Sequence, residues 1–359
     1  MRFPEFSGEW KKYSLGEVAD FVKERISTDK LTLTTYVSTE NMRSDFGGIN
    51  PAISIPNNTN VIHYKKRDVL LSNIRPYLRK VWSANYDGGC SADVFVFRAK
   101  HITPFFLYYI IANDTFINYV MSGAKGVKMP RGDKEQMLKY TFSIPTMEEQ
   151  NKISHILHLL DDRISTQNKI IEKLETLIKG ISALCLKNST LTGKWVKLGD
   201  ICQITTGKLD ANAMVEDGAY PFFTCAERPF RINEYAFNTE ALLISGNGAN
   251  LGYINYYKGK FNAYQRTYVL DKFTEDIQFV RFILKVNLPI RIAIERSTSN
   301  TPYIVLSTLA GMKLFIPPKS LQQCITNLLL SIEAKLSIHT ALLVDYSNLK
   351  SYLLQQMFI

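Results

Sequence analysis

Two stretches of the chain, 146–190 and 317–359, carry apolar residues at alternating steps of four and three. This spacing is typical of a helix that buries one narrow face against another helix. The first seam comprises Ile153, Leu157, Leu160, Ile164, Gln167, Ile171 and Leu174, and it continues through Ile178, Ile181 and Cys185. Adding 172 to each number gives the second seam: Ile325, Leu329, Ile332, Leu336, His339, Leu343 and Tyr346, followed by Lys350, Leu353 and Met357.

Each seam has a polar residue in the same layer, Gln167 in the first and His339 in the second. A lone polar residue in an apolar seam fixes the register of a helix pair. We therefore expect the two helices to pair antiparallel, each about 60 Å long, with these two side chains within about 11 Å of each other. One alternative is that each helix packs separately on a globular domain, and another is that Gln167 and His339 are merely solvated.

The two helices begin with similar sequences. Phe142 to Ile153 reads FSIPTMEEQNKI, and Leu314 to Ile325 reads LFIPPKSLQQCI. The patterns Thr146-x-x-Glu149 and Ser320-x-x-Gln323 are typical of a capping box, in which a hydroxyl and a carboxyl or amide satisfy amides at the helix start. Both helices are thus predicted to start just after an Ile-Pro pair.

The regions before the helices also match each other. Trp10 precedes LGEV, and Trp195 precedes LGDI. Two strand-like pairs follow, 68–73 with 241–246 and 90–97 with 262–270, and then two short apolar helices at 105–110 and 279–284. The sequence predicts an α/β protein with a pseudo-twofold internal repeat, built from two mixed α/β domains, 1–145 and 191–316, and two long helices, 146–190 and 317–359. The polar stretch 186–195 is the predicted linker.

The net charge of +10 is concentrated in the two predicted globular domains. Residues 1–145 carry 20 basic and 14 acidic side chains, and residues 191–316 carry 14 and 11. Basic domains favour a polyanionic partner such as nucleic acid, although an ordinary basic surface has the same composition.

Other classes of protein have little support. The five cysteines show no CxxC spacing, so reduced thiols in a cytoplasmic protein are expected. The start of the chain lacks the apolar run of a signal peptide, and the longest apolar run, 105–112, is too short to span a membrane.

The order and duplication of these motifs resemble the specificity subunit of type I restriction-modification systems. The resemblance implies two target-recognition domains, each reading half of a split site in double-stranded DNA. It implies helices that act as a spacer and dock two DNA methyltransferase subunits, with ATP-dependent restriction endonuclease subunits joining the complex. S-adenosylmethionine, ATP and magnesium would then belong to the partners, and this chain would hold no cofactor. One departure is Leu321, which stands where the first helix start has Glu149.

No catalytic or metal site is expected. The segment SNTPY, Ser299 to Tyr303, approaches the Asn-Pro-Pro-Tyr loop of adenine methyltransferases, but Thr301 replaces the first proline. The segment 244–252 contains three glycines without matching a nucleotide-binding loop, and it is interpreted as a turn near DNA or a plain hairpin. His155 and His158 lack a nearby carboxylate or cysteine that would complete a metal site.

Basic, amide and aromatic side chains in the two domains are the candidates for DNA contact, because phosphates attract cations and base edges are read by Arg, Asn and Gln. In the first domain they are Lys65, Lys66, Arg67, Arg75, Tyr77, Arg79, Lys80, Lys125, Lys128 and Arg131. In the second they are Arg228, Arg231, Asn247, Asn250, Tyr253, Gln265, Arg266, Arg296, Asn300 and Tyr303. Two rival interpretations are a stand-alone duplicated DNA-binding protein and a methyltransferase that uses the segment 299–303.

Overall fold

The computed structural model describes residues 2–187, 192–296 and 303–357, without the side chains at 186–187 and 295–296. The chain forms two compact units. Unit 1 contains residues 1–166 and 343–359, and unit 2 contains residues 167–342. Each unit therefore combines one globular part with a piece of both long helices, α5 (Met147–Lys187) and α9 (Lys319–Met357).

The first and last strands of the globular part of unit 1 form a two-stranded ribbon, in which β1 (Lys11–Ser14) pairs antiparallel with β10 (Thr141–Ile144). Between these strands lie two four-stranded sheets, in the orders β2-β9-β6-β7 and β3-β5-β8-β4. Their bounds are β2 Ala19–Phe21, β9 Val94–Ala99, β6 Val69–Ser72, β7 Val81–Ser83, β3 Arg25–Ser27, β5 Asn60–Tyr64, β8 Gly88–Cys90 and β4 Tyr36–Val37. The helices are α1 (Leu15–Val18), α2 (Pro104–Ile111), α3 (Asp114–Ser122) and α4 (Lys134–Leu138), with single turns η1 (Thr28–Lys30) and η2 (Pro76–Leu78).

Unit 2 repeats the two-stranded ribbon with β11 (Lys194–Lys197) and β18 (Lys313–Ile316). Its strands form one six-stranded sheet, in the order β12-β17-β15-β16-β13-β14. Their bounds are β12 Gln203–Thr206, β17 Thr267–Asp271, β15 Phe237–Ser245, β16 Ile254–Ala263, β13 Tyr220–Phe223 and β14 Phe230–Ile232. The helices are α6 (Leu198–Ile201), α7 (Ile277–Arg296) and α8 (Leu306–Ala310), with the single turn η3 (Ala211–Ala213).

The apolar segments paired in the sequence occupy matching places. The predicted strands at 68–73 and 241–246 are β6 and β15, and the segments 90–97 and 262–270 contain most of β9 and β17. In unit 1, β6 pairs antiparallel with β9, and in unit 2, β15 pairs antiparallel with β17. The predicted helix at 279–284 is α7, which runs on to Arg296. It continues because Leu288 and Ile292, one and two turns further on, also pack in the core of unit 2.

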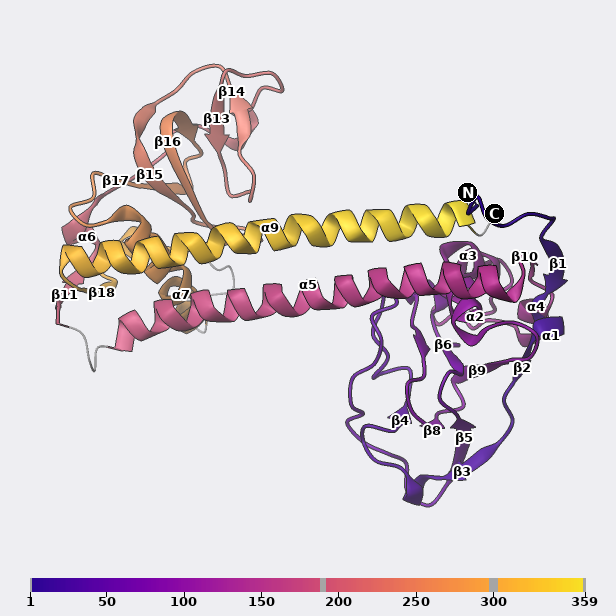
Figure 1. The fold of residues 1–359 in the computed structure, drawn as a ribbon. Coiled ribbons are helices and arrows are strands. Elements are labelled where there is room, and N and C mark those ends of the chain that lie inside the picture. The colour runs from indigo at the N-terminus through magenta and orange to yellow at the C-terminus, as the bar shows by residue number, and fades with distance from the viewer. Residues whose placement is uncertain (1, 188–191, 297–302, 358–359) are drawn as a thin grey trace. The chain divides into compact units, whose positions relative to one another are not determined.

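The seam residues of α5 and α9 all lie in buried or half-buried positions. In unit 1 the start of α5 and the end of α9 share a core, in which Ile153, Leu157 and Met357 pack together with the globular part. In unit 2 the end of α5 and the start of α9 share the other core, through Cys185 and Ile325. Within each unit the two helices are thus antiparallel, as expected (Figure 1).

The duplicated helix start positions a buried glutamine in each unit. The Gln150 side chain accepts from the Thr103 amide at 2.9 Å and donates to the Pro145 carbonyl at 3.0 Å. The Gln322 side chain accepts from the Asp276 amide at 3.0 Å and donates to the Pro317 carbonyl at 2.8 Å. Each glutamine therefore joins the long helix to the Ile-Pro turn before it and to the start of the buried helix, α2 or α7.

The capping boxes form only in part. The Thr146 hydroxyl accepts from the Glu149 amide at 3.4 Å, but the Glu149 carboxylate binds the Arg2 guanidinium at 2.9 and 3.0 Å. The prediction of the second capping box is wrong. Helix α9 begins at Lys319, so Ser320 lies inside the helix and not at its cap. The Gln323 side chain donates forward along the helix to Asn327 at 3.1 Å. The residue at the position of Glu149 in α9 is Leu321, an apolar side chain that cannot form such an ion pair.

Candidate nucleic-acid interface

Three loops of unit 1 meet where β6 ends, and we call residues 73–80, 91–93 and 123–133 the unit 1 edge. The Asn73 amide donates to the Asp93 carbonyl at 2.8 Å, and the Arg75 amide donates to the Pro130 carbonyl at 2.8 Å. The backbones of Lys125 and Arg131 exchange two hydrogen bonds of 2.9 Å. These bonds place most candidate residues of the first domain on one surface.

The corresponding place in unit 2 is where β15 ends, and residues 225–228, 246–253, 264–266 and 303–306 form the unit 2 edge. The Gly246 amide donates to the Arg266 carbonyl at 2.9 Å, and the Ile304 amide donates to the Gly246 carbonyl at 2.9 Å. Asn247 and Tyr303 form an antiparallel bridge, as Ile74 and Arg131 do in unit 1. Both units therefore build this edge with the same backbone connections.

Two glycines give the unit 2 edge its shape. A Cβ atom on Gly246 would lie 2.5 Å from the Arg266 carbonyl oxygen, so only glycine allows this close approach. Gly248 has a φ of +81°, in the left-handed region that side chains disfavour. The glycine-rich segment of the sequence is thus a hairpin between β15 and β16 that also forms part of the edge.

Several candidate cations of unit 1 already have protein partners. The Arg79 guanidinium binds Asp114 at 3.1 Å and forms two hydrogen bonds with Asp45, and these bonds raise its pKa. The remaining pairs are Lys80 with the Thr39 carbonyl at 2.6 Å, Lys125 with Asp133 at 2.9 Å, Arg131 with Asp93 at 3.3 Å and Lys65 with Glu24 at 3.2 Å. A side chain that is held in this way contributes less to binding, because the internal pair must be broken or shared.

The other candidates of unit 1 are exposed. Arg75, Tyr77 and Lys128 are exposed on the unit 1 edge. Lys66 and Arg67 are also exposed, but they precede β6 and so lie at the opposite end of that strand, together with Lys65. The sequence predicted one set of candidates, and the structure divides it between two ends of the sheet.

The candidates of unit 2 divide into internal and exposed side chains. Arg231 donates to the Gly218 carbonyl at 2.9 Å and to the Ala219 carbonyl at 3.2 Å, so it holds a turn. Asn247 and Asn250 hold the 225–228 loop, through the Cys225 thiol at 3.0 Å and the Cys225 carbonyl at 3.1 Å. The exposed members are Arg228, Tyr253, Gln265, Arg266 and Tyr303, whereas the Arg296 side chain and Asn300 lie outside the described residues.

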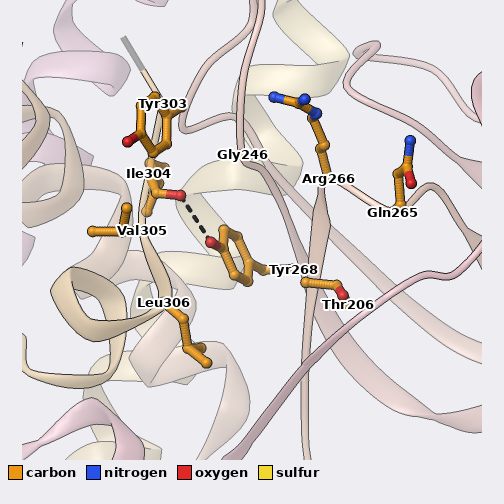
Figure 2. A pocket seen from close by; sticks show the side chains of 9 residues that line it. All are labelled: Thr206, Gly246, Gln265, Arg266, Tyr268, Tyr303, Ile304, Val305 and Leu306. Atoms are coloured by element: carbon orange, nitrogen blue, oxygen red, sulfur yellow. Dashed lines mark hydrogen bonds between the residues drawn. The ribbon is translucent and has the colours of Figure 1, made fainter. Parts of the chain in front are cut away.

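A cavity of about 250 Å³ lies in the unit 2 edge and is lined by Thr206, Gly246, Gln265, Arg266, Tyr268, Tyr303, Ile304, Val305 and Leu306. Its floor is held by the Tyr268 hydroxyl, which donates to the Ile304 carbonyl at 2.8 Å (Figure 2). The polar side chains that line it, Thr206, Gln265, Arg266 and Tyr303, can donate hydrogen bonds to a ligand. Among the residues with described side chains, no group of three or more His, Cys, Asp or Glu could hold a metal ion.

Two charged clusters attach the globular parts to the helices, and neither was predicted from the sequence. In unit 1, Asp161 on α5 accepts from the Tyr109 hydroxyl at 2.8 Å and from Lys350 at 2.5 Å. In unit 2, Glu333 on α9 accepts from Arg281 at 2.5 Å and from Lys285 at 2.9 Å. Asp161 and Glu333 are 172 residues apart, as are Tyr109 and Arg281, so the repeat length could have identified these pairs.

Known proteins similar to this chain were found by sequence and by structure. The family model described as "Type I restriction modification DNA specificity domain" matches residues 7–176 and 193–344. The EcoDI type I restriction enzyme specificity subunit of Escherichia coli is 43% identical over 132 residues, which are 37% of this chain and 29% of that protein. The MjaIX specificity subunit of Methanocaldococcus jannaschii is 25% identical over 258 residues, 61% of this chain and 60% of that protein. The chain thus matches less than two thirds of the length of either relative.

The fold has a solved counterpart over its whole length. The S subunit of a type I restriction-modification system from M. genitalium aligns with a TM-score of 0.74 and 16% identity, covering 100% of this chain and 99% of that one. A second structure, described as the basis of complex assembly and conformational transition of the type I R-M system, aligns with a TM-score of 0.56 and 19% identity over 98% of both chains. At these identities the likeness concerns the fold, and the family is given by the sequence model. Since that model matches both copies of the repeat, the chain belongs to the family of type I restriction modification DNA specificity domains.

Proposed function

We propose that this protein is the non-catalytic specificity subunit of a type I restriction-modification complex, in which each unit reads one half of a bipartite DNA site. The observation that carries the proposal is the edge built twice with the same backbone connections and different side chains. Equal scaffolds with unequal surfaces suit a protein that reads two different half-sites. The relatives named specificity subunits support the same function.

The long helices are proposed to set the gap between the half-sites and to dock two DNA methyltransferase subunits. Apolar side chains outside the seam support docking, since they remain exposed on both helices. On the unit 1 pieces they are Met147, Leu159, Val344, Leu349 and Tyr352, and on the unit 2 pieces Leu177, Leu184, Leu328, Leu330 and Ile338. Exposed apolar residues gathered on one element mark a surface for a protein partner.

By length and composition α9 could also cross a membrane, with a mean hydropathy of 1.3 in its most apolar window. Its two ends pack in the two cores, but only 6% of that apolar window is buried within the chain, so we propose that protein partners cover the remainder. We propose a cytoplasmic complex with double-stranded DNA, methyltransferase subunits and ATP-dependent restriction endonuclease subunits. S-adenosylmethionine, ATP and magnesium would be bound by those partners.

The test is to express the chain with a candidate type I DNA methyltransferase subunit from the same genome and to map methylated bases in the host DNA. A split, asymmetric motif that requires both proteins is the expected result. Replacing residues 1–145 by those of a relative should change one half of the motif and leave the other intact. If both halves change, or neither does, the modular interpretation is wrong.

The same experiment separates the rival functions. A stand-alone DNA-binding protein would not co-purify with the methyltransferase and would not direct its methylation. A methyltransferase using the segment 299–303 would bind S-adenosylmethionine and methylate DNA without the partner. Of that segment only Tyr303 lies within the described residues.

A further inference from the structure

Asp93 and Arg266 occupy the same place in the two edges. The Asp93 carbonyl accepts from the residue that follows β6, and the Arg266 carbonyl accepts from the residue that follows β15. Both residues immediately precede a matching strand, β9 or β17, by one position. Arg131 and Tyr303 correspond in the same way. Arg131 forms a β-bridge with the second residue after β6, and Tyr303 forms one with the second residue after β15. One scaffold position thus carries an acid in unit 1 and an arginine in unit 2.

The two side chains differ in whether they are free to bind. In unit 1, Asp93 and Arg131 lie 3.3 Å apart and neutralise each other. In unit 2, Tyr303 stands in place of the arginine, and the Arg266 guanidinium has no hydrogen bond or ion pair with any other described residue. Arg266 is therefore an exposed fork of N–H donors that is available to a ligand.

The backbone of Arg266 is nevertheless held firmly. Its carbonyl accepts from the Gly246 amide at 2.9 Å and from the Cys225 thiol at 3.6 Å. A tight turn precedes β17, in which the Thr267 amide donates to the Tyr264 carbonyl at 2.8 Å. Because the backbone of Arg266 is already fixed, only its side chain has to be ordered when a ligand binds. Such a donor fork can recognise a ligand directionally.

The surroundings suit the edge of a base. Figure 2 shows Arg266 and Tyr303 at one end of the cavity, with Gly246 between them and Leu306 toward the other end. The wall formed by Ile304, Val305 and Leu306 is apolar, whereas the rim carries N–H and O–H donors. A guanidinium fork binds a phosphate as well as a base edge. The apolar wall favours the base, because a base offers an apolar face to pack against it and a phosphate does not.

We propose that Arg266 is a specificity-determining residue that reads a guanine in the half-site recognised by unit 2, donating two hydrogen bonds to O6 and N7. Guanine presents two acceptors side by side in the major groove, which match the guanidinium fork. Unit 1 cannot make this contact at its equivalent position, because Asp93 is an acceptor already paired with Arg131. The inference rests on the proposed function and assigns one base of one half-site.

The test uses the full chain in complex with its methyltransferase and a pool of random-sequence duplexes. Sequencing of the bound duplexes gives the preferred motif, and the replacement of residues 1–145 identifies the half that belongs to unit 2. The variants are Arg266→Ala and Arg266→Lys, since lysine keeps the charge but loses the fork. Unchanged melting temperatures verify folding, which we expect because the side chain is exposed.

Both variants should lose preference for guanine at one position of that half, by on the order of 10- to 100-fold, and should retain the other half. The proposal is overturned if that half has no fixed guanine, or if the preference survives in both variants. It is also overturned if Arg266→Ala weakens all duplexes equally while Arg266→Lys restores them, because that pattern identifies a phosphate contact. Wild-type complex without any sequence preference would instead overturn the proposed function.

Discussion

The Oε1 atom of Gln167 lies 2.7 Å from the Nδ1 atom of His339, so the two polar seam residues are hydrogen-bonded across the helix pair. Gln167 is buried, with 8% of its surface exposed. The two residues are separated by the repeat length of 172, so this contact pairs α5 and α9 at equivalent positions of the repeat. The distance is well within the expected limit of about 11 Å, which is two helical turns.

Replacing one member of this pair should cost more than replacing both. Gln167→Leu leaves the half-buried His339 without its partner, and His339→Leu leaves the buried Gln167 without its partner. We expect a loss of about 1–3 kcal/mol in the free energy of unfolding, larger for His339→Leu. The double variant removes both polar groups and should recover most of that loss. Denaturant unfolding of the four proteins gives the coupling energy.

The control for this cycle is Asn168→Leu, which changes an exposed neighbour of Gln167 and should leave stability nearly unchanged. Additive effects of the two single changes would contradict an energetic coupling. The double variant should also lose register specificity, because an apolar layer accepts other alignments of the helices. Disulfide cross-linking of cysteine pairs placed in and out of register would detect this.

The buried glutamines should be essential at both helix starts. Gln150→Ala removes two hydrogen bonds and leaves the Thr103 amide and the Pro145 carbonyl unsatisfied, so a loss of about 2 kcal/mol or more is expected. Gln322→Ala should have a similar effect in unit 2. Thermal unfolding would measure both.

Gln323→Ala is the matched control, since this exposed side chain donates to Asn327 within α9 and contacts no other described element through a hydrogen bond. Its expected effect is a few tenths of a kcal/mol, the size of a surface helix pair. If Gln323→Ala lost more unfolding free energy than Gln322→Ala, the predicted capping box, and not the buried glutamine, would be the main stabiliser of this helix start.

Glu333 should make the stability of unit 2 depend on acid. Burial raises the pKa of Glu333, but hydrogen bonds from Arg281 and Lys285 outweigh burial and hold it below the ordinary value of 4.5. A carboxyl with a lowered folded-state pKa stabilises fully above the unfolded value, and this contribution is lost as pH falls through the folded value. The stability difference between wild type and Glu333→Gln should therefore be constant above about pH 5 and shrink below 4.5.

Unfolding in urea at several pH values would measure that difference. The control is Glu216→Gln, which changes an exposed carboxylate that has no hydrogen bond or ion pair with another described residue. If the stability difference between wild type and Glu333→Gln grew as pH fell, the pKa of Glu333 would be raised and not lowered by folding.

The long-range plan of this fold could be predicted because it is repetitive. Heptad spacing gave the seams, and the 172-residue offset gave the contact between Gln167 and His339, since both depend only on positions along the chain. Gln150 and Gln322 were visible as a motif, but their partners, Thr103 and Asp276, are brought to them by tertiary packing. Sequence spacing therefore identified the helix starts without explaining them.

The candidate interface was predictable only as a set of residue types. Arg75 and Arg79 are four residues apart and look alike in sequence, but Arg79 is bound by Asp45 and Asp114. Asp93 was not a candidate, because a search for cations ignores the acids that neutralise them. Which cations remain available depends on loops from distant segments, and one-dimensional patterns do not contain that information.

DNA binding should depend steeply on salt, and the slope should report which cations touch phosphates. Each phosphate contact contributes about 0.9 to the slope of log K against log salt concentration. Lys128→Gln on the unit 1 edge should reduce the slope by about that amount. Lys66→Gln should leave it unchanged, because Lys66 lies at the opposite end of β6. Titrations by fluorescence anisotropy at several salt concentrations would compare them, and equal slopes for all three proteins would contradict the assignment of the edge.

The helices should determine the number of base pairs between the two half-sites. Four residues inserted near Leu186 lengthen an α-helix by roughly 6 Å, about one turn, which keeps the seam nearly in phase. Since base pairs are spaced by about 3.4 Å along the duplex, the gap in the methylated motif should grow by one or two base pairs. The bases read by each unit should not change, because neither edge is altered. Mapping of methylated sites with the extended chain measures both quantities together. An unchanged gap would exclude a spacer role for the helices, and altered bases with the same gap would mean that the insertion disturbs unit 2 itself.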